Sequence, residues 1–110
     1  MSANVLVILS SGEKEKALTG IMYAVNSQKN QWLENVKVVF FGPFERLICE
    51  DESVAKAASR LLEYETPIAC KFISDDTDLS GKLEELGYDV EYVGTIISEY
   101  IQMGYVPMVF

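Results

Sequence analysis

The residue with the clearest potential for covalent chemistry is Cys70, in the segment TPIACKFISDD at residues 66–76. Its thiolate would be a strong nucleophile, and both the cation of Lys71 and the N-terminus of a following helix would stabilise that ionised form. Asp75 and Asp76 act in the opposite direction, because negative charges disfavour a thiolate. The residue chemistry therefore leaves two roles open for Cys70: a reactive thiol, or a small apolar residue that fills the core.

Other reactive groups are scarce in this chain. It contains no histidine, so Ser-His-Asp and Cys-His pairs are excluded, and no spacing of carboxylates singles out an acid/base pair. Cys49 follows Leu47 and Ile48 in FERLICEDE, which indicates a packed and inert thiol. Two cysteines without histidine cannot supply the four ligands of a structural zinc site, and we expect no cofactor. A redox pair of Cys49 and Cys70 would require Cα atoms within about 7 Å, a distance that the sequence does not give.

Two further stretches superficially resemble ligand-binding motifs. DTDLSG at residues 76–81 places oxygens and a glycine as in the first half of a calcium loop, but Gly87 stands where the loop needs a glutamate. Ser10-Ser11-Gly12 follows a predicted strand, yet it lacks the glycine spacing of dinucleotide and P-loop motifs. We interpret the first as a solvated turn before a helix and the second as a helix cap.

Size and charge limit the possible classes of protein. A chain of 110 residues with 49% hydrophobic and 24% charged residues suffices for one globular domain, spanning residues 1–110. Nine basic and seventeen acidic side chains give a net charge of -8, which repels nucleic-acid phosphates. The apolar runs are far shorter than the ~20 residues that cross a bilayer, and no basic leader with a cleavage site precedes them. We expect a cytoplasmic protein that binds neither nucleic acid nor a membrane.

The chain alternates short apolar runs with segments of helical periodicity, which indicates βα units and a mostly parallel sheet. The first two strands are continuously apolar and should be covered on both faces. The fourth alternates in polarity and the fifth contains Pro107, so both belong at the edges of the sheet. The predicted strands lie at residues 5–9, 36–41, 68 to 72 or 73, 89–94 and 105–110.

Four helices are predicted between these strands. Ser10 and Glu13 have the spacing of a capping box before the first helix, and Asp78 is placed as the N-cap of the third. Gly87 and Gly104 are placed to end the third and fourth helices. The apolar positions that define the four helices are Ala17, Leu18, Ile21, Met22 and Val25; Val54, Ala57, Ala58, Leu61 and Leu62; Leu79, Leu83 and Leu86; and Ile97, Tyr100 and Ile101.

Several segments together resemble the DsrE/DsrF-like family of small α/β proteins, which includes the sulfur-relay subunits of the DsrEFH and TusBCD complexes. The matching features are a strand that ends in Phe-Gly-Pro, a single cysteine at the third strand, and GYDVEYVG followed by IISEYIQMGYVPMVF. The resemblance covers nearly the whole chain. It implies a three-layer α/β/α sandwich with a five-stranded parallel sheet in the order 4-3-2-1-5, and assembly into homotrimers or homohexamers. The residue patterns alone also allow the order 2-1-3-4-5.

The order 4-3-2-1-5 has a consequence for helix placement. With right-handed crossovers, the first three connections lie on one face of the sheet, and only the fourth helix lies on the other. Because the strands at 5–9 and 36–41 are apolar on both sides, part of the second face would stay exposed in a monomer. Self-association would cover it, so we expect a homo-oligomer.

In relay members of the family, the cysteine after the third strand carries sulfur as a persulfide. The resemblance implies this role for Cys70, with Lys71 stabilising its thiolate. The hypothesis is a sulfur carrier of sulfurtransferase type: the Cys70 thiolate attacks a donor persulfide, holds the sulfane sulfur and releases it to an acceptor thiol of another relay protein.

The alternative hypothesis is a non-enzymatic, oligomeric module of the same fold that binds a small ligand or a protein without thiol chemistry. Tyr88, Tyr92, Tyr100 and Phe44 would line its cleft, although aromatic residues at such positions also serve as core. Solvent access to Cys70 separates the two hypotheses, because persulfide exchange requires a reachable thiolate.

Overall fold

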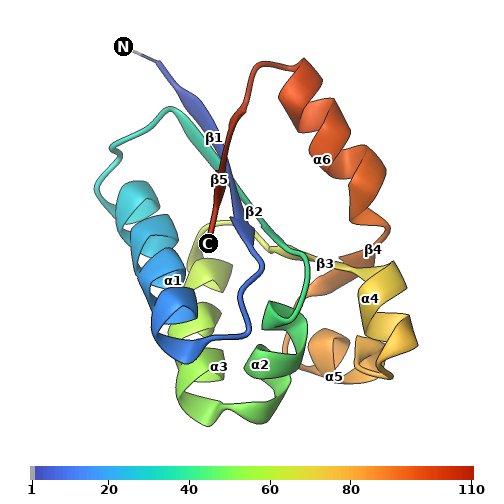
Figure 1. Cartoon of the computed structure of the whole chain (residues 1–110). Helices are drawn as coiled ribbons and strands as arrows, with labels where there is room; N and C mark the ends of the chain where they lie inside the picture. The colour runs from blue at the N-terminus through green and yellow to red at the C-terminus, as the bar shows by residue number, and fades with distance from the viewer. Residues whose placement is uncertain (1) are drawn as a thin grey trace.

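The computed structural model describes residues 2–110, and its five strands form one parallel sheet in the order β4-β3-β2-β1-β5 (Figure 1). The order implied by the family resemblance is confirmed, and the alternative order 2-1-3-4-5 is excluded. The fourth and fifth strands lie at the edges, as their sequences predict. The strands are β1 (Asn4–Leu9), β2 (Asn35–Phe40), β3 (Ile68–Cys70), β4 (Asp89–Glu91) and β5 (Val106–Val109).

Helices cover both faces of the sheet. In Figure 1, α1, α2 and α3 lie together, whereas α6 lies apart from them beside the red end of the chain. No helix within residues 2–110 is long and apolar enough to cross a membrane. The helices are α1 (Lys14–Lys29), α2 (Phe44–Glu50), α3 (Glu52–Ser59), the 3-10 helix η1 (Arg60–Glu63), α4 (Lys71–Asp76), α5 (Ser80–Glu85) and α6 (Val93–Gln102).

β1 connects the two hydrophobic cores of the molecule. It pairs with β2 along its full length and with β5 on its other edge. Successive side chains of a strand point to opposite faces, so Val5, Val7 and Leu9 join the core of α1 and α3, while Leu6 and Ile8 join the core of α6. All five side chains are buried, as the continuous apolar run predicts.

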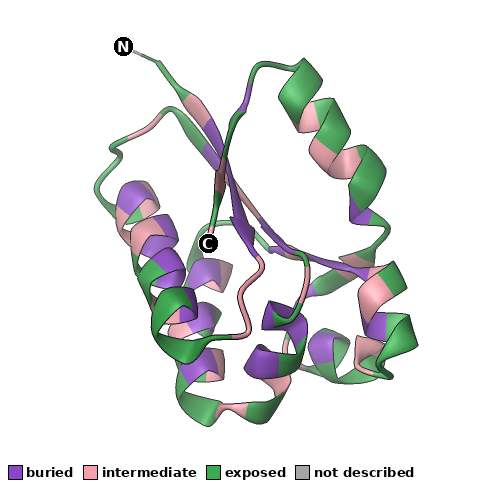
Figure 2. Ribbon diagram, viewed as in Figure 1, coloured by how far each residue is buried: buried purple, intermediate pink, exposed green. Residues whose placement is uncertain are grey.

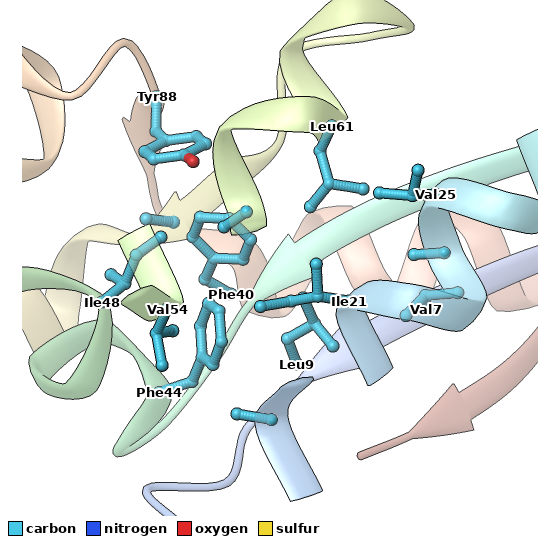
Figure 3. Packing of buried hydrophobic residues seen from close by; sticks show 14 of the residues in the cluster. Val7, Leu9, Ile21, Val25, Phe40, Phe44, Ile48, Val54, Leu61 and Tyr88 are labelled. Carbon is cyan, nitrogen blue, oxygen red and sulfur yellow. The ribbon is translucent and has the colours of Figure 1, made fainter. Parts of the chain in front are cut away.

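The two cores differ in size. The larger one fills the space between the sheet and α1, α2, α3 and α5, and buried residues line the inner sides of these helices (Figure 2). Phe40 lies in its middle, with its ring centroid 4.8 Å from those of Phe44 and Tyr88 (Figure 3). The smaller core lies under α6, where the ring centroids of Tyr100 and Tyr105 are 4.8 Å apart. One face therefore has a single covering helix, as the strand order implies.

The segment after Cys70 differs from the prediction. We expected β3 to continue to Phe72 or Ile73 and then a polar run, but the strand ends at Cys70 and α4 follows at once. The reason is that Phe72 is apolar without being core: 72% of its surface is exposed. An apolar run does not by itself show where a strand ends, because its last residues can face solvent.

The helix ends agree with the prediction at the C-termini of α5 and α6 and differ at both predicted N-caps, Ser10 and Asp78. Gly87 and Gly104 follow α5 and α6 with φ values of 102° and 90°, the left-handed region in which glycine ends helices. Asp78 does not cap α5, because it has a φ of 59° and the N-cap position is Leu79. Asp78 therefore forms the turn between α4 and α5 instead of capping the helix.

The predicted second helix is divided into three pieces, α2, α3 and η1. Asp51 separates α2 from α3 with an extended backbone, and its carboxylate accepts bonds from the N–H groups of Ser53 and Val54 at 2.9 and 3.1 Å. The Ser53 hydroxyl, the Val54 amide and the nearby Lys14 ammonium lower the pKa of Asp51 to about 2. Val54, Ala58 and Leu61 are buried as predicted.

Gly20 lies where α1 is closest to the sheet, since an added Cβ would be 2.6 Å from Leu9 Cδ2 and 2.7 Å from Phe110 Cβ. Gly20→Ala should destabilise the protein by about 1–3 kcal/mol, although alanine is the better helix former. Gly81→Ala is the control, because nothing lies within 4 Å of its added methyl, and it should be neutral or stabilising. Urea unfolding measures both free energies of unfolding, and equal values would disprove the tight α1 contact.

Candidate functional site

The carboxyl ends of β1 and β2 lie at the edge of the sheet where open α/β folds place their ligands. The two loops that follow them are packed on each other. A Cβ atom at Gly42, whose φ is 128°, would lie 2.6 Å from Ser10 Oγ. The N–H groups of Ser10 and Ser11 donate to the carbonyl of Phe110 at 2.7 and 3.0 Å. The C-terminal residue and the Gly42 turn therefore occupy the space beside the loop after β1.

The loop after β1 caps its helix through a different residue from the one predicted. Ser10 is not the N-cap of α1; the N-cap is Glu13, whose carboxylate accepts from the N–H groups of Glu15 and Lys16 at 3.0 and 2.8 Å. Ser11 Oγ accepts from the N–H of Glu13 at 3.0 Å. A carboxylate thus occupies the position that a bound phosphate would need at this helix end.

Cys70 is the last residue of β3, opposite Glu91 of β4, and the N-cap residue of α4. Its location at the carboxyl end of a strand agrees with the ligand edge of the sheet. Only 4% of its surface is exposed. In this arrangement a donor persulfide cannot reach the sulfur, because thiol exchange needs an accessible thiolate.

Lys71, the predicted stabiliser of the thiolate, begins α4 and forms an ion pair along that helix. Its Nζ donates to Asp75 Oδ2 at 2.9 Å, and both side chains are partly exposed. The hydrogen bond to Asp75 raises the pKa of Lys71, and the same bond lowers the pKa of Asp75. The ammonium group is therefore directed along α4 toward a carboxylate.

The stretch that resembles a calcium loop forms the junction of α4 and α5. Ser80 Oγ donates to Asp75 Oδ1 at 2.5 Å and shares a 2.6 Å hydrogen bond with Ser74 Oγ. Ser74 is the buried residue of α4. These oxygens connect two short helices, and within the described chain no group of three or more acidic or cysteine side chains is arranged to hold a metal ion.

Cys49 lies on α2 and is half-buried, and both cysteines are free thiols. Burial raises the pKa of the Cys49 thiol, Lys82 of α5 lowers it, and Glu45 and Glu50 raise it. The predicted packed thiol agrees with this environment. The influence of Lys82 also shows that this side of α2 faces α5.

The functional group that sequence reasoning missed is Glu45, in the first turn of α2. Its side chain is completely buried, and neither carboxylate oxygen has a hydrogen-bond partner within residues 2–110. Burial raises the pKa of Glu45 to about 8, although the Gly42 backbone lowers it in part. At neutral pH the folded chain therefore keeps this carboxyl group protonated.

A sequence signal for Glu45 existed in the periodicity of α2. Phe44, Leu47 and Ile48 form the buried face of this helix, and Glu45 lies beside them, one turn before Cys49. This position did not stand out in the sequence, because a glutamate at the border of an apolar face ordinarily extends into solvent.

A hollow of about 370 Å³ opens between the start of α2 and α4. Gly42, Pro43 and Arg46 line one side, and Ile73 and Thr77 line the other. Its walls are mostly apolar, and it lies at the carboxyl end of β2. It is the hollow nearest to the ligand edge predicted from the fold.

The four aromatic residues proposed for a cleft are distributed differently. Phe44 and Tyr88 are buried in the larger core, and burial raises the pKa of Tyr88 to about 12. Tyr100 packs against Tyr105 under α6. Only Tyr92 of the four is exposed, so these residues do not form one ligand-binding cleft.

No family model matches this chain, and no curated protein matches it. Among solved structures, it is similar to a conserved protein of unknown function, BT1422 from Bacteroides thetaiotaomicron. The two chains are 24% identical, the alignment covers 97% of this chain and 95% of that one, and the TM-score is 0.88. This similarity shows the α/β fold with its 4-3-2-1-5 sheet.

Glu45 should make the stability of the protein depend on pH. Between the ordinary carboxyl pKa of 4.5 and about 8, the unfolded chain releases the Glu45 proton while the folded chain keeps it, so this contribution falls as pH rises. Glu45→Gln removes the loss and should raise the free energy of unfolding above pH 8 by at most about 5 kcal/mol.

The measurement is urea unfolding of the wild type and Glu45→Gln from pH 4.5 to 9. Glu85→Gln is the matched control, because Glu85 is exposed on α5, and it should retain the wild-type pH dependence. Parallel curves for the wild type and Glu45→Gln would show that Glu45 ionises normally in the folded chain.

Proposed function

We propose that this chain is a self-assembling, DsrE-like protein-binding subunit in which Cys70 performs no thiol chemistry while its side chain is buried. The observation that carries the proposal is the contrast between a sealed thiol and an uncharged, exposed C-terminal segment. Cys70 is 4% exposed, whereas large apolar side chains of α6 and β5 face solvent. Contact with another copy of the chain is the role that these surfaces support best.

The distribution of charge selects the contact region. The chain has 26 charged residues, nine basic and seventeen acidic, but the last of them is Glu99, so residues 100–110 contain none. A net charge of -8 makes most surfaces of two copies repel each other. The uncharged segment is where a second copy meets the least repulsion.

The same segment exposes apolar side chains. We define the C-terminal surface as Ile101, Met103, Val106 and Val109, all of which are exposed, with Met103 at 65%. Val106 and Val109 point to opposite faces of the sheet, so this surface extends around the edge strand β5. Figure 2 shows the end of α6 and most of β5 in the colour of exposed residues. Burying such side chains between two copies removes apolar area from water, which favours association.

β5 also offers free backbone groups at the edge of the sheet. The N–H of Phe110 donates to Ile8 of β1 at 2.9 Å, so alternate residues Pro107 and Val109 direct their backbone groups outward. Pro107 therefore costs the β1 ladder no hydrogen bond. Pro107 has no N–H to donate on this outer edge and opposes strand pairing there, so the contact with a second copy would rest on the apolar side chains.

Val109→Glu should dissociate the assembly, because it places a charge in the C-terminal surface of a chain that is already acidic. We expect sedimentation equilibrium to give an oligomer for the wild type, three or six copies by the family resemblance, and at least a tenfold weaker association for the variant, or about 1.4 kcal/mol. Phe72→Glu is the control, since it adds the same charge at an exposed site on α4. A wild-type monomer at micromolar concentration would disprove self-assembly.

A second candidate function is that Cys70 carries sulfur, and the position of Cys70 in the fold favours this function. The thiol lies at the carboxyl end of β3, directly before a six-residue helix that buries only Ser74. This candidate keeps the role expected from the family resemblance.

Mass spectrometry after incubation with a persulfide donor at pH 7 distinguishes the candidates. We expect no added sulfur on the native wild type, because Cys70 is buried, and Cys49→Ser should give the same result. Added sulfur on the wild type and on Cys49→Ser, but not on Cys70→Ser, would establish the carrier and replace our first proposal.

A further inference from the structure

Glu45 lies on the side of α2 that packs against the α4 and α5 pair. α2 contacts both of these helices. Cys49 is one turn after Glu45 on the same side, and its thiol is influenced by Lys82 of α5. The buried carboxyl group therefore belongs to the boundary between α2 and the two short helices that follow Cys70.

The α4 helix is weakly held in this position. Ser74 is its one buried residue, and its hydrogen bonds run to the carbonyl of Lys71 and to Ser80. Phe72 extends into solvent. With so little apolar area to remove from water, separating α4 from α2 costs little compared with opening either core.

We propose that Glu45 is a proton-operated latch: its neutral carboxyl group keeps α2 closed on α4 and α5, and its ionisation releases α4. A neutral carboxyl group can remain in a dry position at moderate cost, whereas an unpaired carboxylate there is far more costly. The carboxylate can be hydrated at the lowest free-energy cost if water enters at the weakest neighbouring contact, which is the contact with α4. The burial that raises the pKa of Glu45 to about 8 places the transition just above neutral pH.

No neighbouring cation within residues 2–110 pairs with Glu45. Lys71 is paired with Asp75, and Arg46 is paired with Glu50. Neither oxygen of Glu45 has a partner in the described part of the chain. The charged and titratable groups on α2 and on the elements around it are Arg46, Cys49 and Glu50 on α2; Glu52 and Lys56 on α3; Lys71, Asp75 and Asp76 on α4; Lys82, Glu84 and Glu85 on α5; and Tyr88 before β4.

The latch is separate from the proposed self-assembly, because it concerns the contact of α2 with α4 and α5, whereas the C-terminal surface lies on the end of α6 and on β5. The ligand of the latch is the proton. The Glu45 carboxyl group lines none of the surface hollows described for residues 2–110, so these hollows give a larger ligand no access to it.

Amide hydrogen exchange, followed by mass spectrometry from pH 6 to 9.5 and corrected for intrinsic exchange rates, tests the latch. In the wild type, peptides covering α4 should lose protection at least about tenfold as pH rises through about 8, while peptides of β1 and α1 keep theirs. Glu45→Gln should show no such loss. Glu85→Gln, which removes an exposed carboxylate on α5, should behave as the wild type.

Equal exchange profiles with and without Glu45, or a loss of protection throughout the chain, would overturn the local latch. If Glu45→Gln fails to fold, carbon-13 NMR titration of the wild-type glutamate carboxyls decides, because a Glu45 resonance that titrates near 4.5 would also overturn it.

Discussion

The burial of β1 on both faces is the constraint on which the remaining structure depends. Its five apolar residues alternate between two cores, and its two edges hold β2 and β5. Helix α1 approaches it so closely that Gly20 has no room for a side chain. Because β5 pairs with β1, the carbonyl of Phe110 reaches the amides of Ser10 and Ser11 in the loop after β1.

Charge distinguishes two places in this structure. The chain has a net charge of -8, yet its last eleven residues, 100–110, have no charged side chain and expose apolar ones. On α2, Glu45 is buried without a hydrogen-bond partner within the described residues. The C-terminal segment lacks the charges that are common in the rest of the chain, and Glu45 is a buried acid in a chain whose acids are mostly exposed. Both places are therefore candidates for function rather than for stability.

The thiol is controlled by packing more than by its charged neighbours. Cys70 ends a strand and precedes a helix, a location typical of ligand sites in parallel sheets. However, Lys71 is engaged with Asp75 in the same helix, and the sulfur is covered. Any chemistry at this position depends on uncovering the sulfur, which points to the α6 face of the sheet because Ala69 before it belongs to the larger core.

The sequence by itself determined the five strands, their two edge members, the main helices and the helix-ending glycines, because these follow from periodicity and backbone preference. Sheet order came from the family resemblance. Only the tertiary structure decided that β3 stops at Cys70, that Cys70 is sealed, and that Glu45 rather than a cysteine is the unusual titratable group. Exposure and desolvation depend on which distant elements pack around a side chain, and no local pattern records that.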